Sequence, residues 1–81
     1  MTEAELKTLI CDLFLGGDTS FPMDTDTDLL GEGICDSLGL VQLAGDLEGL
    51  VPGLRILDQE VTRENMGSLG AIMAFIAQKT A

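Results

Sequence analysis

The chain has 81 residues, which is enough for one folded domain, spanning 1–81, and too few for two. Its hydrophobic fraction of 46% is ordinary for a folded domain and argues against intrinsic disorder. Fourteen acidic against four basic side chains give a net charge of −10, which disfavours nucleic acids and anionic membranes as partners and favours proteins with basic patches.

The first predicted helix begins at a capping box formed by Thr2 and Glu5, in which each side chain accepts the other's free backbone N–H. Hydrophobic residues then recur at helical spacing, which predicts a single buried stripe. Gly16-Gly17 follows and is expected to end the helix, because glycine adopts the left-handed conformation without a steric penalty. The residues of the stripe are Leu6, Leu9, Ile10, Leu13 and Phe14.

The next segment, 18–36, shows no helical or strand periodicity and is rich in Asp, Thr, Ser and Gly. Loops of this length are uncommon in small domains and are often functional. Its scattered hydrophobic residues predict that the loop is anchored to the core and not free in solvent. These residues are Phe21, Leu29, Leu30 and Ile34.

A second helix is predicted to begin at Asp36-Ser37 and to stop before Pro52. Its hydrophobic positions again follow helical spacing and predict one buried face. That face consists of Leu40, Leu43, Ala44, Leu47, Leu50 and Val51.

The last third of the chain contains a turn region followed by two more helix starts. Thr62 is expected to cap a single helical turn over 62–65, and Ser68 is expected to cap the last helix. Three main helices, one short helix and a long first loop predict an all-α fold, a small four-helix bundle. The inward positions of the last helix are Leu69, Ile72, Met73 and Ile76, and the turn region contributes Leu54, Ile56 and Val61.

The chain has two cysteines and no histidine, which limits the chemistry open to it. A Cys/His zinc site and a Ser-His-Asp or Cys-His catalytic arrangement are both excluded. No phosphate-binding loop or dinucleotide motif is present, and a small helical core offers little room for an active-site pocket, so we predict no enzyme and no metal site. Because a secretory signal and a long apolar segment are lacking, we expect a cytoplasmic monomer in which Cys11 and Cys35 are buried free thiols.

Alternating aspartates at 24–28 resemble the start of a calcium-binding EF-hand loop. The sixth loop position should be Gly and is Leu29, and the twelfth should be Glu and is Cys35. Both differences remove features that the calcium loop needs, so a polar turn is favoured over a true EF-hand. An acidic helical interaction module, or a weak calcium binder, remains the alternative function.

The segment from Asp28 to Leu43 places an acidic, glycine-containing loop directly before an amphipathic helix. Asp36 can cap this helix, which leaves Ser37 in the first turn with its hydroxyl free to face solvent. A phosphodiester on that hydroxyl would be stabilised by the positive end of the helix dipole, by ~0.3–1 kcal/mol at an exposed site. An isolated Asp-Ser pair is also a common helix cap, so the rest of the sequence is needed to distinguish a modified serine from an ordinary cap.

The wider sequence resembles the attachment region of acyl and peptidyl carrier proteins. The similarity rests on Gly-Ile-Cys-Asp-Ser-Leu at 33–38, followed by Val-Gln-Leu at 41–43 and Leu-Glu at 47–48. It extends over nearly the whole chain, from the first helix with its glycine end, through the long loop, to the last helix with Ser68-Leu69 at its start.

The resemblance implies that Ser37 receives 4′-phosphopantetheine from coenzyme A, attached by a magnesium-dependent phosphopantetheinyl transferase, with Asp36 helping to position that enzyme and its metal. The thiol of the arm would carry acyl or aminoacyl groups as thioesters. An acyl- or aminoacyl-activating ligase would load them, and acyltransferases or synthases would use them. Partners would dock on the second helix, at Leu38, Val41, Gln42, Asp46 and Glu48.

The second helix differs from that of typical fatty-acid carriers, which crowd acidic residues along it. Here Gly39, Gln42, Gly45 and Gly49 dilute the acids. The sequence around Ser37 is closer to D-alanyl and other free-standing aminoacyl carriers. A specialised acyl or aminoacyl pathway, of the polyketide or nonribosomal-peptide kind, is therefore at least as well supported as fatty-acid synthesis.

Overall fold

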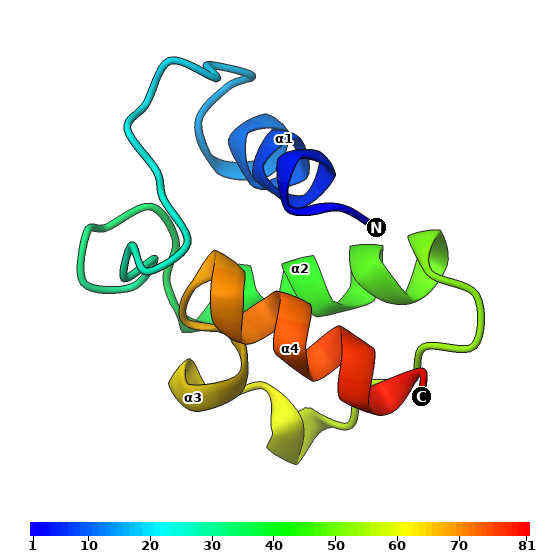
Figure 1. Ribbon diagram of the computed structural model, residues 1–81. Helices are drawn as coiled ribbons and strands as arrows, with labels where there is room; N and C mark the ends of the chain where they lie inside the picture. The colour runs from blue at the N-terminus through cyan, green and yellow to red at the C-terminus, as the bar shows by residue number, and fades with distance from the viewer.

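The computed structural model describes all residues, 1–81, and is all-helical, without strands, as the sequence predicts (Figure 1). It measures 31 × 22 × 19 Å along its principal axes. None of the helices combines the length and hydrophobicity that a membrane span requires. The helices are α1 (Glu3–Phe14), α2 (Ser37–Leu50), α3 (Arg63–Met66) and α4 (Leu69–Lys79), with a short 3₁₀ turn, η1 (Asp58–Glu60), before α3.

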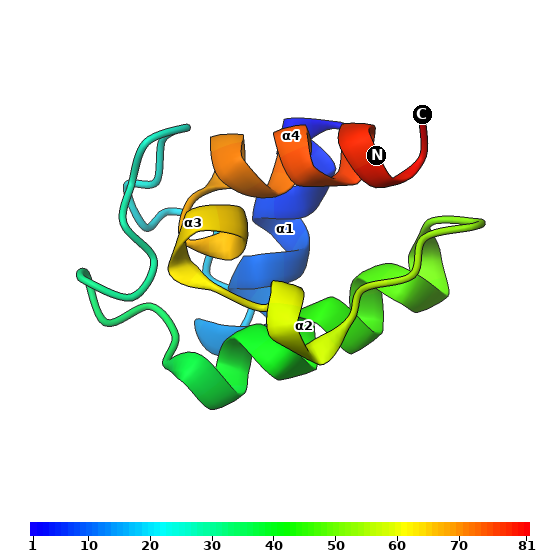
Figure 2. The ribbon, with the colours of Figure 1, turned by 90° about the horizontal axis from the view of Figure 1, so that it is seen from below.

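The helices surround one core. Helix α1 packs against both α2 and α4, and α3 packs against α4. Helices α2 and α4 run in the same direction, which two perpendicular views show (Figures 1 and 2). The long loop between α1 and α2 lies at the end of the molecule where α2 and α4 begin (Figure 1).

Each helix begins at the capping residue that the sequence predicts. The capping box of α1 is complete, with Thr2 N donating to Glu5 Oε1 at 2.8 Å and Glu5 N donating to Thr2 Oγ1 at 3.1 Å. The side chains of Asp36, Thr62 and Ser68 accept the third backbone N–H of α2, α3 and α4. These caps satisfy backbone donors that a helix leaves free at its start, so the chain itself defines where the helices begin.

The core is one cluster of 18 buried hydrophobic residues drawn from the helices and from the loops between them. One residue predicted to be buried on a helix face is exposed, and one buried residue was not predicted. Leu50 is 58% exposed and not buried, because it lies at the edge of an open hollow between the start of α1 and the end of α2. Phe75 is buried although the predicted stripe omitted it, because the packed face of α4 is wider than that stripe, and Met73 is half-buried.

The long loop is anchored to the core as predicted. Leu29 is fully buried, its N–H donates to Gly67 O at 2.8 Å, and its carbonyl accepts the N–H groups of Ile34 and Cys35. This ties the loop to the junction of α3 and α4 and sets the path into α2.

A second attachment lies further back in the loop, where Gly70 N donates to Thr25 O at 2.9 Å. A Cβ on Gly70 would lie 2.7 Å from Thr25 Cγ2 and 3.3 Å from Thr25 O, so the close approach of loop and helix favours glycine there. These two backbone hydrogen bonds hold the loop to the segment that joins and begins the last two helices.

The connection between α2 and α3 is held by two carboxylates. Glu48 Oε2 accepts the N–H of Ile56 at 2.8 Å, which joins the segment to α2. Glu60 caps its own 3₁₀ turn by accepting the N–H of Leu57 and forms an ion pair with Lys79 at 2.8 Å. The hydrogen bond from Lys79, followed by the Leu57 N–H, lowers the pKa of Glu60. The last turn of α4 is thereby attached to the connection.

We predict that Leu29→Ala lowers the free energy of unfolding by about 2–5 kcal/mol, the range found for buried leucines in helices, because it leaves a cavity where the loop meets the core. Denaturant unfolding followed by circular dichroism measures this. The matched control is Leu38→Ala, whose side chain is 76% exposed and whose loss should cost less than about 0.5 kcal/mol. Equal, small effects for both variants would contradict a loop that is part of the core.

Candidate functional site

Ser37 is the first residue of α2, and its position is set by the residue before it. Asp36 has an extended backbone, and its Oδ1 accepts the N–H of Gly39 at 2.8 Å. The carbonyl of Asp36 accepts the N–H of Leu40, which closes the first turn. Both Asp36 and Ser37 are exposed, as predicted, so the first turn of α2 presents a hydroxyl to solvent.

The three serines of the chain differ in how their hydroxyls are used. The hydroxyl of Ser20 donates to Asp18 Oδ1 at 2.6 Å, which lowers the pKa of that carboxyl. The hydroxyl of Ser68 accepts the N–H of Ala71 and caps α4. The hydroxyl of Ser37 makes no hydrogen bond within the protein, and it is the one serine hydroxyl that the fold leaves free.

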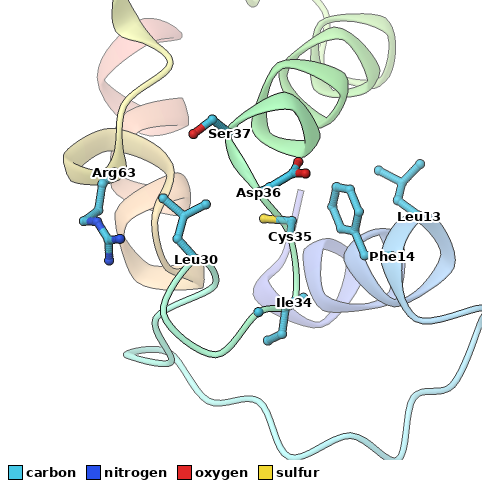
Figure 3. Close-up of a pocket in the computed structure, with 9 residues that line it drawn as sticks. Leu13, Phe14, Leu30, Ile34, Cys35, Asp36, Ser37 and Arg63 are labelled. Atoms are coloured by element: carbon cyan, nitrogen blue, oxygen red, sulfur yellow. The ribbon is translucent and has the colours of Figure 1, made fainter.

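An open hollow of about 630 Å³ lies beside Ser37 (Figure 3). The end of α1 forms one side of it, the loop before α2 forms its base, and Arg63 of α3 stands on the other side (Figure 3). More than half of the lining residues are hydrophobic. The hollow is lined by Leu13, Phe14, Leu30, Gly33, Ile34, Cys35, Asp36, Ser37 and Arg63.

Two glycines shape this region. Gly33 has a φ of 72°, a left-handed conformation that turns the chain just before it enters α2. Gly39 is buried where α2 meets the end of α1, and a Cβ there would lie 3.0 Å from both Cys35 Cβ and Phe14 Cε1. The sequence suggested only that Gly39 dilutes the acids of the helix. The structure shows that it allows α2 to approach α1 closely.

The basic residue at the hollow is held by an acid from the loop. Arg63 Nη1 lies 2.6 Å from Asp28 Oδ2 in an exposed ion pair. The pKa of Asp28 is lowered, mainly by the N–H of Gly31 at 3.0 Å and further by the charge of Arg63. This pair joins the loop to α3, at the side of the hollow that Arg63 lines.

The cysteine next to the site is chemically quiet. Cys35 is buried, and burial together with the negative charge of Asp36 raises the pKa of its thiol. Because the thiolate is the reactive form, a raised pKa makes Cys35 a poor nucleophile at neutral pH. Cys11 and Cys35 are both free and buried, as expected. Ser37 therefore has no activated cysteine beside it.

The residues predicted to dock partners fall into two groups. Leu38 and Val41 are 76% and 53% exposed, and exposed Gln42 lies beside them on the same side of α2. Asp46 and Glu48 are half-buried, and Glu48 is bonded to Ile56 N within the protein. The structure therefore brings the first group together next to Ser37. It gives Glu48 a structural contact that the sequence did not indicate.

The aspartates of the loop are used to build turns. Asp24 Oδ1 accepts the N–H of Asp26 and the hydroxyl of Thr27, while Asp28 accepts the N–H of Gly31 and pairs with Arg63. No group of three or more acidic, cysteine or histidine side chains is placed to hold a metal ion. Asp24 and Asp28 are therefore engaged in the hydrogen bonds of their own turns.

Comparison with known proteins adds no assignment, since no protein-family model and no curated protein matches the chain significantly. The interpretation of the site therefore rests on the geometry around Ser37. This geometry offers an exposed hydroxyl at the positive end of a helix, next to the capping carboxylate of Asp36 and beside a partly apolar hollow.

We predict that Asp36→Ala lowers the free energy of unfolding by about 1 kcal/mol, because the Gly39 N–H loses its acceptor. Asp36→Asn should retain the stability, since asparagine caps helices about as well as aspartate. Denaturant titration of the three proteins measures this. Equal losses in both variants would show that Asp36 stabilises the protein through its charge and not through the cap.

Proposed function

We propose that the protein is a carrier that holds acyl or aminoacyl groups as thioesters on a 4′-phosphopantetheine arm attached to Ser37. The fold would then be a small four-helix bundle of the carrier type, with the arm at the start of its second helix. The observation that carries the proposal is the free, exposed hydroxyl of Ser37 directly after the capping Asp36. The sequence around it supports the proposal, because it resembles carrier attachment regions.

The residues present fit a phosphodiester at this position. The N–H groups of Ser37 and Leu38 have no acceptor within the protein, and both point out of the first turn of α2. The positive end of the helix dipole favours negative charge here. Arg63 lines the neighbouring hollow, but its guanidinium is paired with Asp28. The carboxylate of Asp36 opposes a further negative charge, but that carboxylate is turned toward Gly39 N.

Attachment requires little of this chain beyond the hydroxyl. Ser37 Oγ forms the new bond to the phosphorus of coenzyme A that bears the pantetheine arm. The bond from that phosphorus to the adenosine 3′,5′-bisphosphate breaks, and the serine proton passes to a base of the transferase. The arm, when bound, supplies a terminal thiol that carries the cargo as a thioester. The carboxylate of Asp36 beside Ser37 accepts the N–H of Gly39, and the thiol of Cys35 has a raised pKa because it is buried and lies next to Asp36, so in this proposal the transferase supplies the catalytic groups.

The surface beside Ser37 suits transient contact with partner enzymes. Leu38 and Val41 are large hydrophobic side chains that the protein leaves exposed, and Gln42 completes the patch. The surrounding acidic surface, with a net charge of −10, would speed encounter with basic partners. Such partners would be the phosphopantetheinyl transferase, a ligase that activates the acyl or aminoacyl group, and the acyltransferases or synthases that use it.

The alternative is an acidic interaction module without a prosthetic group, or a weak calcium binder. An interaction module would use its charge and have no need for a free hydroxyl at Ser37. The calcium version has less support, because the loop aspartates already accept hydrogen bonds from their own turns. We therefore favour the carrier, and one experiment separates the two functions.

We predict that coenzyme A, Mg²⁺ and a broad-specificity phosphopantetheinyl transferase add about 340 Da, one phosphopantetheine, to the protein. Intact-mass spectrometry measures the gain. Ser37→Ala should abolish it, since no other hydroxyl occupies the first turn of α2. Ser20→Ala is the matched control and should be modified like the parent protein.

An unmodified parent protein under conditions in which a known carrier is fully converted would contradict the carrier function. A mass gain that persists in Ser37→Ala would show that the arm is attached to another residue. The free hydroxyl of Ser37 would then no longer support the carrier function. Unmodified protein together with charge-dependent partner binding would instead support the interaction module.

A further inference from the structure

A groove lies between α1 and the C-terminal half of α2, away from the hollow at Ser37. Two adjoining hollows of about 390 and 440 Å³ make it up, and they share Leu9 and Leu50. No residue of this groove lines the hollow at Ser37. We call it the α1–α2 groove and define it by its floor (Leu9, Gly45, Gly49, Leu50, Val51) and its acidic edge (Glu5, Asp12, Asp46).

The floor of the groove is apolar and partly uncovered. Leu50 is 58% exposed at the end of α2, and Leu9 and Val51 are half-buried. A leucine this exposed on the floor of a groove leaves much of its apolar surface without a partner. It offers an apolar contact to a side chain that enters from outside.

Two glycines on the floor are not explained by the fold. Gly45 and Gly49 are inside α2, neither has a positive φ, and a Cβ on either would meet no atom within 4 Å. Alanine would therefore fit at both positions and would favour the helix more than glycine does. They are one helical turn apart and leave the backbone of α2 bare along the groove, which lets an incoming element approach closely.

The edge of the groove is acidic, and the α-amino group of Met1, near Glu5, is the one positive charge that lines it. Asp12 and Asp46 form no hydrogen bond or ion pair within the protein, and Glu5 accepts only its helix-capping N–H. None of the four basic side chains of the protein lines the groove. The groove thus combines an apolar floor with unpaired negative charge on both of the helices that form it.

We propose that the α1–α2 groove binds a basic amphipathic helix of a partner protein, with small or aliphatic side chains on the floor and Lys or Arg against the acidic edge. Charge complementarity selects this occupant. A second copy of this chain would bring a net charge of −10 and the same acidic edge to the contact, so it is disfavoured. The inference rests on the groove alone and does not depend on an arm at Ser37.

The test uses a synthetic helical peptide that carries leucine and alanine on one face and lysines on its flanks, and a second peptide with glutamates in place of the lysines. We expect the lysine peptide to shift the backbone amide signals of Leu9, Gly45, Gly49 and Leu50 in the ¹⁵N-labelled full chain, with saturation. The glutamate peptide should leave them unchanged, because it repels the acidic edge.

Filling the groove should weaken binding without harming the fold. Gly45→Leu should reduce the affinity for the lysine peptide by at least about tenfold, because the new side chain occupies the floor. Ala74→Leu adds similar bulk at an exposed position of α4 and is the matched control. Gly45→Ala provides a smaller change that favours the helix, and it should weaken binding less while raising the midpoint of denaturant unfolding.

Removing the edge charges tests the selection of a basic partner. The double variant Asp12→Asn with Asp46→Asn should bind the lysine peptide several-fold more weakly than the parent, with a shallower dependence on salt. Glu64→Gln removes one charge at an exposed position of α3 and should have little effect.

Several results would overturn the proposal. Amide shifts spread over the whole acidic surface would show non-specific attraction, and shifts confined to Leu38 and Val41 would place the contact beside Ser37 instead. If Gly45→Leu bound the lysine peptide as tightly as the parent protein, the floor of the groove would be excluded as the binding site. Shifts of the groove amides with rising protein concentration alone would identify a second copy as the occupant.

Discussion

The buried side chain of Leu29 and the hydrogen bonds of its backbone hold the long loop, and through it the start of α2, in place. The side chain of Leu29 packs in the core, and its N–H donates to the carbonyl of Gly67. Its carbonyl accepts the N–H groups of Ile34 and Cys35, where the chain turns toward α2. A loop of this length would otherwise leave the first turn of α2 without a fixed position. Because the same segment leads into Ser37, the packing of Leu29 and the cap at Asp36 together fix where the exposed hydroxyl lies beside the hollow.

Helix α2 then presents two different surfaces along its length. Its N-terminal end carries Ser37, with the hydrophobic patch beside it and a positive dipole end that tolerates a phosphodiester. Its C-terminal half is bare at Gly45 and Gly49 and forms the floor of the α1–α2 groove. With both proposals combined, a partner binds the C-terminal half of α2 through the α1–α2 groove while its active site reaches the arm at the N-terminal end. Binding and chemistry would then be served by separate contacts.

Features that depend on residues close together in the sequence could be predicted. All four capping residues, the glycine end of α1 and the exposed Asp36-Ser37 pair follow from patterns three or four residues long. Contacts between distant segments could not, because no local pattern encodes them. Three such contacts join Thr25 to Gly70, Ile56 to Glu48 and Arg63 to Asp28. The exposure of Leu50 likewise depends on how α1 and α2 pack and could not be predicted locally. The sequence thus predicted Ser37 and its capping residue Asp36. The hollow beside Ser37, with Arg63 in its lining, was visible only in the tertiary structure.

The most direct test of the central claim is tandem mass spectrometry of the protein isolated from the cells that produce it. The carrier account predicts that the proteolytic peptide containing Ser37 carries an additional mass of about 340 Da and releases its pantetheine portion on fragmentation. The same spectra would report any acyl or aminoacyl group still bound to the thiol. A Ser37 peptide found solely in unmodified form, or an arm on another residue, would contradict the account.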